Sequence, residues 1–333
     1  MKPTIICLTP VKNEAWILDR FLQATSLWAD FIIIADQMST DGSQEIAKKY
    51  SKVILIENKS EIFNEPERQK LLINEARKIE GPRLLITLDA DEMFTPNIMT
   101  SPEWKTILNS QPGTIFRFQW ANLRPDMQNM WMSSFLPLGY MDDGNIHSET
   151  TKIHSTRIPL PANHQEIILN QIKVIHFQYT DWERMQSKHR WYQCFERINF
   201  QWKSNLDIFR MYHHMYAIPS NDIVSIPKEW IDEYKKLNID ILNVNFETKL
   251  WWDDKVLEFF EIYGTDRFRK LYIWDVSWEK KSKIWGEKNI KLYKDPRTLI
   301  DRIVQFWLLK SQPYYPSRNI RRVDRIIKRL LKY

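Results

Sequence analysis

The first hundred residues alternate short apolar runs with amphipathic stretches. Four runs predict buried strands because each is short, continuous and apolar, at residues 4–8, 31–35, 53–57 and 84–88. Between them, apolar residues recur at helical spacing, at residues 14–28, 44–50 and 66–79. Strands separated by helices predict an α/β fold with a mostly parallel sheet, flanking helices and right-handed crossovers.

The pattern changes after about residue 100. Residues 114–120 alternate apolar and polar positions, and residues 172–179 read as one more strand. From Trp182 onward the pattern is helical and rich in aromatic residues, with a helix expected at 228–237. We therefore expect an α/β domain over residues 1–180 and a mainly helical region over residues 181–333, suited to acceptor, membrane-surface or partner contacts.

The composition is that of a soluble globular protein, with 43% hydrophobic and 27% charged residues among 333. Only 7 residues are Gly, which leaves little room for glycine-rich phosphate loops, whereas 15 are Trp, which suit thick cores or surfaces that stack on sugar rings. The distant Cys7 and Cys194 form neither a disulfide framework nor a zinc spacing, which favours a reducing compartment. With no apolar leader and no run near the ~20 residues of a membrane helix, we expect a cytoplasmic protein.

The net charge of +6 suits an anionic partner, but most basic residues are spread along the chain, so a nucleic acid is not expected. Residues 318–333 are the exception, because arginines and lysines there alternate with apolar residues at helical spacing. That pattern fits a helix lying on an anionic membrane surface, here the inner face of the membrane. It fits equally a helix packed on its domain with a solvated basic face.

The candidate chemistry lies where the fourth predicted strand ends in Asp89-Ala90-Asp91-Glu92. Carboxylates at a strand end are costly unless something positive lies beside them. A divalent cation carrying phosphate oxygens is the usual solution, since hard cations prefer carboxylate oxygens. Asp36 follows the second predicted strand, and parallel strands bring their carboxyl ends to one edge. The pattern predicts a metal–diphosphate site there, although solvated acidic turns are also common.

Several separated motifs follow one another along the chain. They are Thr9-Pro10-Val11-Lys12-Asn13-Glu14, Asp36 with Ser39-Thr40-Asp41-Gly42-Ser43, Arg68, and Asp89-Ala90-Asp91-Glu92. Together they resemble the family 2 glycosyltransferases of the GT-A nucleotide-sugar fold, and within them the bacterial members that include lipopolysaccharide-core glucosyltransferases. The resemblance is strong over residues 4–100 and loose over 100–180. The family often has Asp-Asp-Gly-Ser where this chain has Asp36-Gln37-Met38-Ser39, so the contacts to the base differ.

The resemblance implies a nucleoside-diphosphate sugar, UDP-linked, as the donor substrate and Mn²⁺ or Mg²⁺ as the metal. The expected donor contacts are Pro10, Asn13, Glu14, Asp36, Arg68 and Asp89. Asp91 would bind the metal, with Asp89 at the ribose or at a metal-bound water, so that the cation stabilises the leaving nucleoside diphosphate. Asp36 would otherwise cap its turn, and Arg68 would otherwise be an exposed helix charge.

The resemblance also places the general base after the Asp-x-Asp motif, since an inverting transfer must deprotonate the acceptor hydroxyl. Glu166 is the first choice and Asp143 the second, with Asp142 and Asp181 behind them; each would otherwise be a solvated loop acid. His176 lies in an apolar strand, where it would complete the metal shell or be a core histidine. Lesser candidates are His154 and His164 for the metal, and Trp120, Trp131 and Tyr140 for an acceptor wall or the core.

The sequence thus predicts a metal-dependent, inverting hexosyltransferase acting on a glycan or lipid-linked glycan acceptor in cell-surface polysaccharide biosynthesis, such as that of lipopolysaccharide. A sugar nucleotidyltransferase also uses an α/β sheet with acidic metal ligands, but that class opens with a glycine-rich loop where residues 9–14 have no glycine. A catalytically silent carbohydrate-binding protein of the same fold is the third hypothesis. The presence of Asp36, Asp89 and Asp91 argues against it.

Overall fold

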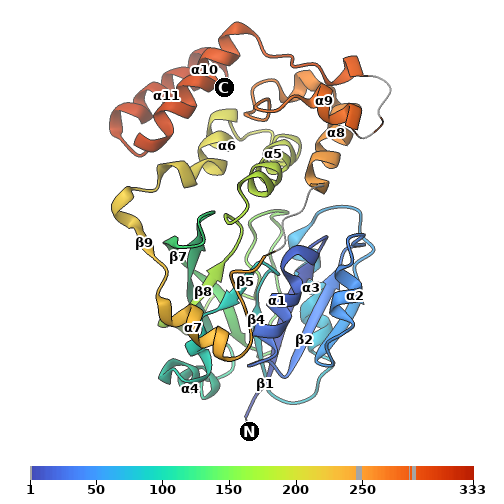
Figure 1. The fold of residues 1–333 in the computed structure, drawn as a ribbon, viewed down its shortest axis with the longest axis vertical. Helices are drawn as coiled ribbons and strands as arrows, with labels where there is room; N and C mark the ends of the chain where they lie inside the picture. The colour runs from blue at the N-terminus through green and yellow to red at the C-terminus, as the bar shows by residue number, and fades with distance from the viewer. Residues whose placement is uncertain (1, 245–249, 285, 287–289) are drawn as a thin grey trace. The chain divides into compact units, whose positions relative to one another are not determined.

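The computed structural model describes residues 2–244, 250–284, 286 and 290–333 (Figure 1). The chain divides into two compact units, one of residues 1–180 with 224–246 and one of residues 181–223 with 247–333. The predicted domain division after residue 180 stays a prediction, and residues 224–246 group with the first unit rather than with the helical region.

The first unit is built on one mixed sheet with the strand order β3-β2-β1-β4-β7-β6-β8-β5, and β9 pairs with β7. The first four of these strands are parallel to one another. The next pairs are antiparallel, except that β8 runs parallel to β6. The strands are β1 Thr4–Val11, β2 Phe31–Asp36, β3 Val53–Glu57, β4 Arg83–Thr87, β5 Glu92–Phe94, β6 Ile115–Leu123, β7 Asn129–Met141, β8 Glu166–His176 and β9 Ile223–Ser225.

Helices cover both faces of the parallel half of the sheet. Successive side chains of β1 point to opposite faces, so Cys7 packs into one apolar cluster with α1, and Ile6 packs into another with α3. The helices of this unit are α1 Ala15–Thr25, α2 Ser43–Ala47, α3 Glu65–Ala76, α4 Pro102–Leu108 and α7 Lys228–Lys236. The predicted α/β class is therefore confirmed, with the flanked parallel half that the resemblance to the GT-A fold implies.

The second unit is helical and aromatic, as the sequence predicts. Its core includes stacked rings such as Phe260 and Trp274, whose centroids lie 5.2 Å apart. Its helices are α5 Trp182–Asn199, α6 Asn205–Tyr212, α8 Trp251–Tyr263, α9 Trp278–Ile284, α10 Leu299–Ser311 and α11 Arg318–Leu331. Short 3-10 turns lie at Pro96–Met99 in the first unit and at His214–Ala217, Ser220–Asp222, Thr265–Phe268, Ile290–Tyr293 and Gln312–Tyr314 in the second. Within the described ranges, every helix is too short or too polar to cross a membrane.

Candidate metal and nucleotide site

The carboxyl ends of β2, β1 and β4 meet at one edge of the sheet, as expected for parallel strands. Asp36 at the end of β2 pairs in register with Val11, and the Leu88 N–H after β4 donates to the Leu8 carbonyl of β1. Neighbouring strands lie about 4.8 Å apart, so Asp36 and Asp89 are separated by roughly 10 Å across this edge. That span suits a nucleoside at one end and its diphosphate at the other.

The two loops that follow β1 and β2 are joined by hydrogen bonds into one wall. The Asn13 N–H donates to Ser39 Oγ over 2.8 Å, and the Thr40 N–H donates to Asn13 Oδ1 over 2.8 Å. Likewise, the N–H groups of residues 14 and 15 donate to the side chains of Ser43 and Asp41. The structure thus brings Asn13 and Glu14 to the loop that follows Asp36, with Pro10 beside it on β1.

Asp36 has one carboxylate oxygen committed to its turn and one that is not. Its Oδ2 accepts from the Ser39 N–H over 3.0 Å and from Gln44 Nε2 over 2.7 Å. Its Oδ1 is buried and has no hydrogen-bond partner among the described residues, in a side chain that is 2% exposed. A buried acceptor without a partner costs about 1–3 kcal/mol, so a ligand N–H or hydroxyl at this oxygen would offset that cost.

Arg68 lies on α3, close to the acidic centre. Its guanidinium stands over the Phe63 ring, 5.3 Å from the centroid. Burial raises the pKa of the Glu65 carboxyl, and the positive charges of Arg68 and Arg157 oppose that shift. Asp89 acts on the same carboxyl in the opposite sense. Glu65, which no sequence pattern singles out, therefore belongs to one electrostatic cluster with Arg68 and Asp89.

Arg157 is the positive partner of the acidic motif, and no sequence pattern singles it out. Its Nη2 donates to Asp89 Oδ2 over 2.6 Å and to Glu92 Oε1 over 2.9 Å, while Nη1 donates to Glu92 Oε2 over 2.7 Å. Burial acts to lower the pKa of the Arg157 guanidinium, but the charges of Asp89 and Glu92 outweigh it and raise that pKa. Burial raises the pKa of the Glu92 carboxyl to about 7, against the lowering effect of Arg157.

Asp91, Glu92 and His176 form a buried cluster whose candidate ligand atoms all lie within 4.8 Å of one another. It forms where β5 and β8 pair, because Glu92 faces His176 in register and the Phe177 N–H donates to the Asp91 carbonyl. The distance from His176 Nε2 to Asp91 Oδ2 is 4.0 Å, too long for a hydrogen bond. It is a distance that two ligands of one cation span when each bond is about 2.1 Å.

The orientation of His176 is fixed by Asn122 on β6. Nδ1 of the histidine lies 2.8 Å from Asn122 Oδ1, and the Asn122 amide donates to the Trp131 carbonyl over 3.4 Å. Since Oδ1 can only accept, Nδ1 carries the proton and Nε2 keeps the lone pair of a metal ligand. Trp120 packs on the same ring, with centroids 4.4 Å apart. The structure thus joins His176 to Asp91, with Glu92 in the cluster in place of the predicted Asp89.

Glu166 does not lie at this site, because β8 carries it at the opposite end from His176. Glu166 pairs with Ile115 of β6 and His176 with Asn122, seven positions further along, which at about 3.3 Å each separates the two residues by roughly 20 Å. Glu166 accepts from Arg117 over 2.7 and 2.8 Å and faces His164 Nε2 at 2.8 Å. Hydrogen bonds from Arg117 and then His164 lower the pKa of the Glu166 carboxyl to about 2. A carboxylate with so low a pKa is a weak base, and this one lies at the opposite end of β8 from the cluster.

Asp143 also lies away from the cluster, near the start of β4 rather than its end. The neighbouring Asp142 N–H donates to the Arg83 carbonyl, and its carboxylate pairs with Arg77 and Arg83 at 2.8 and 3.0 Å. Asp143 accepts hydrogen bonds from the Tyr140 hydroxyl and from Asn145. Burial acts to raise the pKa of the Asp143 carboxyl, but these hydrogen bonds outweigh it and lower that pKa.

The remaining candidates mostly have structural roles. Asp181 accepts from the Arg184 N–H at the start of α5 in the second unit. Tyr140 is fully buried, and Trp131 packs on Tyr179 with centroids 4.7 Å apart. His164 faces Glu166, and His154 lies in a loop with a φ of 58°. Of the predicted acceptor aromatics, Trp120 is the one that borders the cluster.

Comparisons with known proteins give only distant structural matches. No family model and no curated protein sequence matches this chain. A structure of glucosyl-3-phosphoglycerate synthase from Mycobacterium tuberculosis, in complex with Mn²⁺, UDP and glucosyl-3-phosphoglycerate, matches with 16% identity and a TM-score of 0.28. That match covers 35% of this chain and 44%, less than half, of the synthase. Residues 1–349 of S. aureus TarS match with 11% identity over 86% of this chain and 92% of that one, with a TM-score of 0.36.

A structure of 4-diphosphocytidyl-2C-methyl-D-erythritol synthase matches with 12% identity, covering 42% of this chain and 76% of that one, with a TM-score of 0.29. Scores at this level carry no argument about chemistry. The α/β fold follows from the strand order of the chain itself, and its function has to be inferred from the side chains gathered at the carboxyl edge of the sheet.

Proposed function

We propose that this chain is a metal-dependent, inverting glycosyltransferase that uses a nucleoside-diphosphate sugar, with UDP as the nucleotide. The observation that carries the proposal is the buried cluster of Asp91, Glu92 and His176, joined through Arg157 to Asp89 at the sheet edge that also holds Asp36. Asp89, which shares Arg157 with Glu92 of the cluster, lies roughly 10 Å from Asp36, a span that suits a nucleoside whose diphosphate extends to the cluster. Family 2 membership, hexosyl transfer and inversion are proposed on the resemblance of the motifs.

The donor atoms of the cluster fit a divalent cation. Asp91 and Glu92 offer carboxylate oxygens, and His176 offers Nε2, a mixed set that suits Mn²⁺ better than Mg²⁺. When bound, such a cation would act as a Lewis acid toward the diphosphate leaving group. Asn122 keeps the His176 lone pair directed at the site, and Arg157 holds Glu92 and Asp89 in place without a cation.

The nucleoside would lie along the wall formed by residues 10–14 and 36–43. Asp36 Oδ1 would accept from an imide N–H or a ribose hydroxyl, which explains why a buried acceptor is retained there. Asp89 has a buried Oδ1 that is likewise without a hydrogen-bond partner among the described residues, so we assign it to the ribose. Arg68 would offset part of the negative charge of the two phosphates.

The sugar would lie against Trp120, whose ring borders both His176 and Arg157. Its indole Nε1 is buried and has no hydrogen-bond partner in the described part of the chain, and a sugar hydroxyl could accept from it. We assign the acceptor to the glycans and lipid-linked glycans of cell-surface polysaccharides, with lipopolysaccharide as the pathway that the resemblance favours.

The experiment measures nucleoside diphosphate released from a panel of nucleotide sugars in the presence of Mn²⁺. We expect release from one donor, lost in Asp91→Ala, while the matched control Asp143→Asn keeps the parent rate. Formation of nucleoside triphosphate from pyrophosphate would instead indicate a nucleotidyltransferase. Glycan binding without turnover or metal dependence would indicate a silent binding protein, and a parent rate in Asp91→Ala would reject the metal assignment.

A further inference from the structure

Helix α10 presents an apolar stripe to solvent. Ile303 and Phe306 are 60% and 61% exposed, and Leu299 and Ile300 extend the stripe toward the start of the helix. These positions share one face because residues three and four apart are neighbours on a helix. The opposite face, with Val304 and Leu308, packs into the core cluster of Leu206, Phe209 and Tyr333. The core of the second unit is therefore already covered without the exposed stripe.

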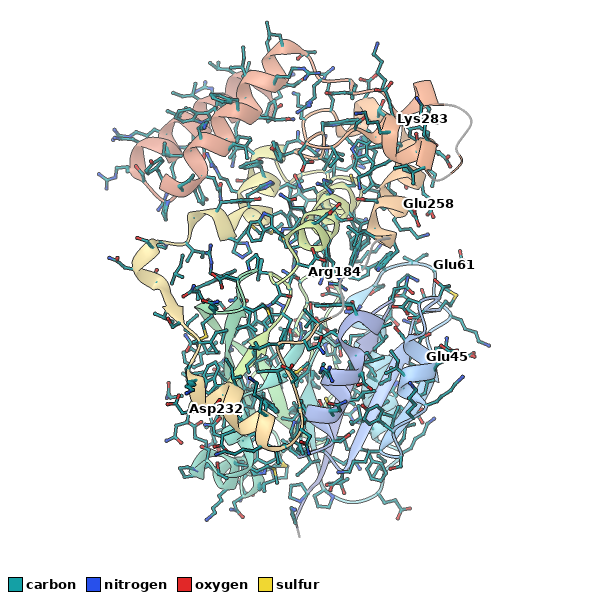
Figure 2. The ribbon with its side chains drawn as sticks, viewed as in Figure 1. Glu45, Glu61, Arg184, Asp232, Glu258 and Lys283 are labelled. Atoms are coloured by element: carbon teal, nitrogen blue, oxygen red, sulfur yellow. The ribbon has the colours of Figure 1, made fainter. Side chains whose placement is uncertain are left out.

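Helix α11 lies beside α10 and adds to this apolar surface (Figure 1). Ile327 and Leu331 pack against the same core cluster, whereas Ile326 and Leu330 are exposed. The two helices form an antiparallel pair, because Tyr333 after α11 bonds to Asp301 near the start of α10. Figure 2 shows many side chains of this helix pair pointing away from the rest of the second unit.

The exposed charge of α11 is almost entirely positive. Arg318, Arg321, Arg322, Arg325 and Arg329 have no carboxylate within ion-pair distance among the described residues. The one acidic residue of the helix, Asp324, is buried and pairs with Arg210 at 2.9 Å. Lys328 pairs with Asp207 of α6. The helix pair therefore combines an apolar stripe with unneutralised cations.

A cavity of about 580 Å³ lies between α6 and α11. Its lining includes Arg318, Arg321 and Arg325, together with Tyr315 and Pro316. The two acids that also line it, Asp207 and Asp324, are already held by Lys328 and Arg210. Arg321 and Arg325 each donate through Nε to a backbone carbonyl, which leaves their terminal amino groups for a ligand, and together with Arg318 they give this cavity the chemistry of a phosphate site.

We propose that the α10–α11 pair docks this protein on a bilayer of anionic lipids. The stripe of α10 enters the boundary between headgroups and acyl chains, and the arginines of α11 bind phosphate headgroups, one of them in the cavity. Amphipathic helices bind membranes through these two contributions together. A second copy of the chain fits less well, because its own α11 would bring the same positive charge. The proposal concerns the second unit alone, so it does not depend on the proposed catalysis.

The experiment is flotation of the whole chain with two kinds of vesicles. One kind contains equal parts phosphatidylglycerol and phosphatidylcholine, and the other contains phosphatidylcholine only. We expect binding to the anionic vesicles that weakens as salt is added, and at least about tenfold weaker binding in the double variant Ile303→Ser/Phe306→Ser. Ile262→Ser on α8 is the matched control, since Ile262 is 68% exposed outside the helix pair, and it should bind like the parent.

The charge contribution is tested with Arg322→Glu/Arg329→Glu, in which we expect about fivefold weaker binding for each basic residue lost. Nucleoside-diphosphate release in solution should be unchanged in both double variants. Failure to bind anionic vesicles would overturn the proposal, as would parent-like binding of the serine variant. Tight binding of inorganic phosphate without vesicle binding, or a dimer dispersed by the serine variant, would identify a different occupant.

Discussion

Arg157 donates hydrogen bonds to both carboxylate oxygens of Glu92, at 2.7 and 2.9 Å, in the interior of the first unit. The same guanidinium reaches Asp89, so one loop residue forms ion pairs with two of the three acids of the motif. The third acid, Asp91, shares its cluster with His176. The site therefore contains a permanent cation and, in the function proposed above, the ligands of a second, exchangeable one.

Replacing Arg157 tests how much its positive charge contributes to stability. In Arg157→Met, Asp89 and Glu92 lose their buried counter-charge, and we expect the free energy of unfolding to fall by about 3–5 kcal/mol. Urea denaturation followed by circular dichroism measures this change. Adding Glu92→Gln to the same chain should restore part of the loss, and equal stability of Arg157→Met and the parent would show that the pair contributes nothing.

Asn122 is predicted to matter through His176. In Asn122→Ala the imidazole loses the acceptor that holds the proton on Nδ1, so Mn²⁺ affinity should fall about 10–100-fold. Isothermal titration with MnCl₂ measures this affinity without any turnover. Asn122→Asp keeps an acceptor at the same position and should bind Mn²⁺ at least as well as the parent. Equal loss in both variants would mean that Asn122 acts through packing.

Glu166→Gln is expected to leave catalysis intact, because Glu166 lies at the far end of β8 from the metal cluster. Because the pKa of Glu166 is lowered in the folded chain, its ionised carboxylate stabilises the fold. This contribution is complete above pH 4.5 and disappears as the pH falls from about 4.5 to about 2. At neutral pH the pair is partly exposed, so the variant should lose less than about 1 kcal/mol. The rate of nucleoside-diphosphate release checks catalysis, and urea midpoints check stability. Loss of that rate at unchanged stability would restore Glu166 as the base.

The buried His213 is expected to make the stability of the second unit sensitive to acid. Burial lowers the pKa of its imidazole from 6.5 to about 4, so the unfolded chain binds the proton first as the pH falls. Stability should therefore decline between pH 6.5 and pH 4, by roughly 3 kcal/mol if the shift is complete. Urea midpoints across this range measure the decline. His213→Gln should flatten it in part, leaving the contribution of His189, whose pKa burial also lowers.

The parallel half of the fold could be predicted because its strands are continuous apolar runs and its helices have clear apolar faces. Asp36 and Asp91 could be placed for the same reason, since strand ends in a parallel sheet have a known common edge. β7 was not predicted because its apolar runs are short and are interrupted by Ser133, Ser134, Pro137 and Gly139. The role of Arg157 was not predicted because a single arginine in an irregular loop belongs to no periodic pattern.

Glu166 was misplaced for a more specific reason. The sequence pattern starts the strand at residue 172, which puts Glu166 in a loop that could fold over the sugar. In the structure β8 already begins at Glu166, because Ile115 and Ile167 lie in the β6–β8 pairing region and extend the ladder. The strand therefore carries the carboxylate away from the edge where the reaction is proposed.

The hydrogen bonds between residues 13–15 and residues 39–43 affect the entropy that would be lost when a ligand binds. The two connections are braced against each other before any ligand arrives, with each amide already directed at its acceptor. The conformational entropy of ordering them is lost during folding, and association need not lose it again. Residues 10–15 and 36–43 would therefore offer the proposed nucleotide a rigid template, and any induced fit would have to come from loop closure elsewhere.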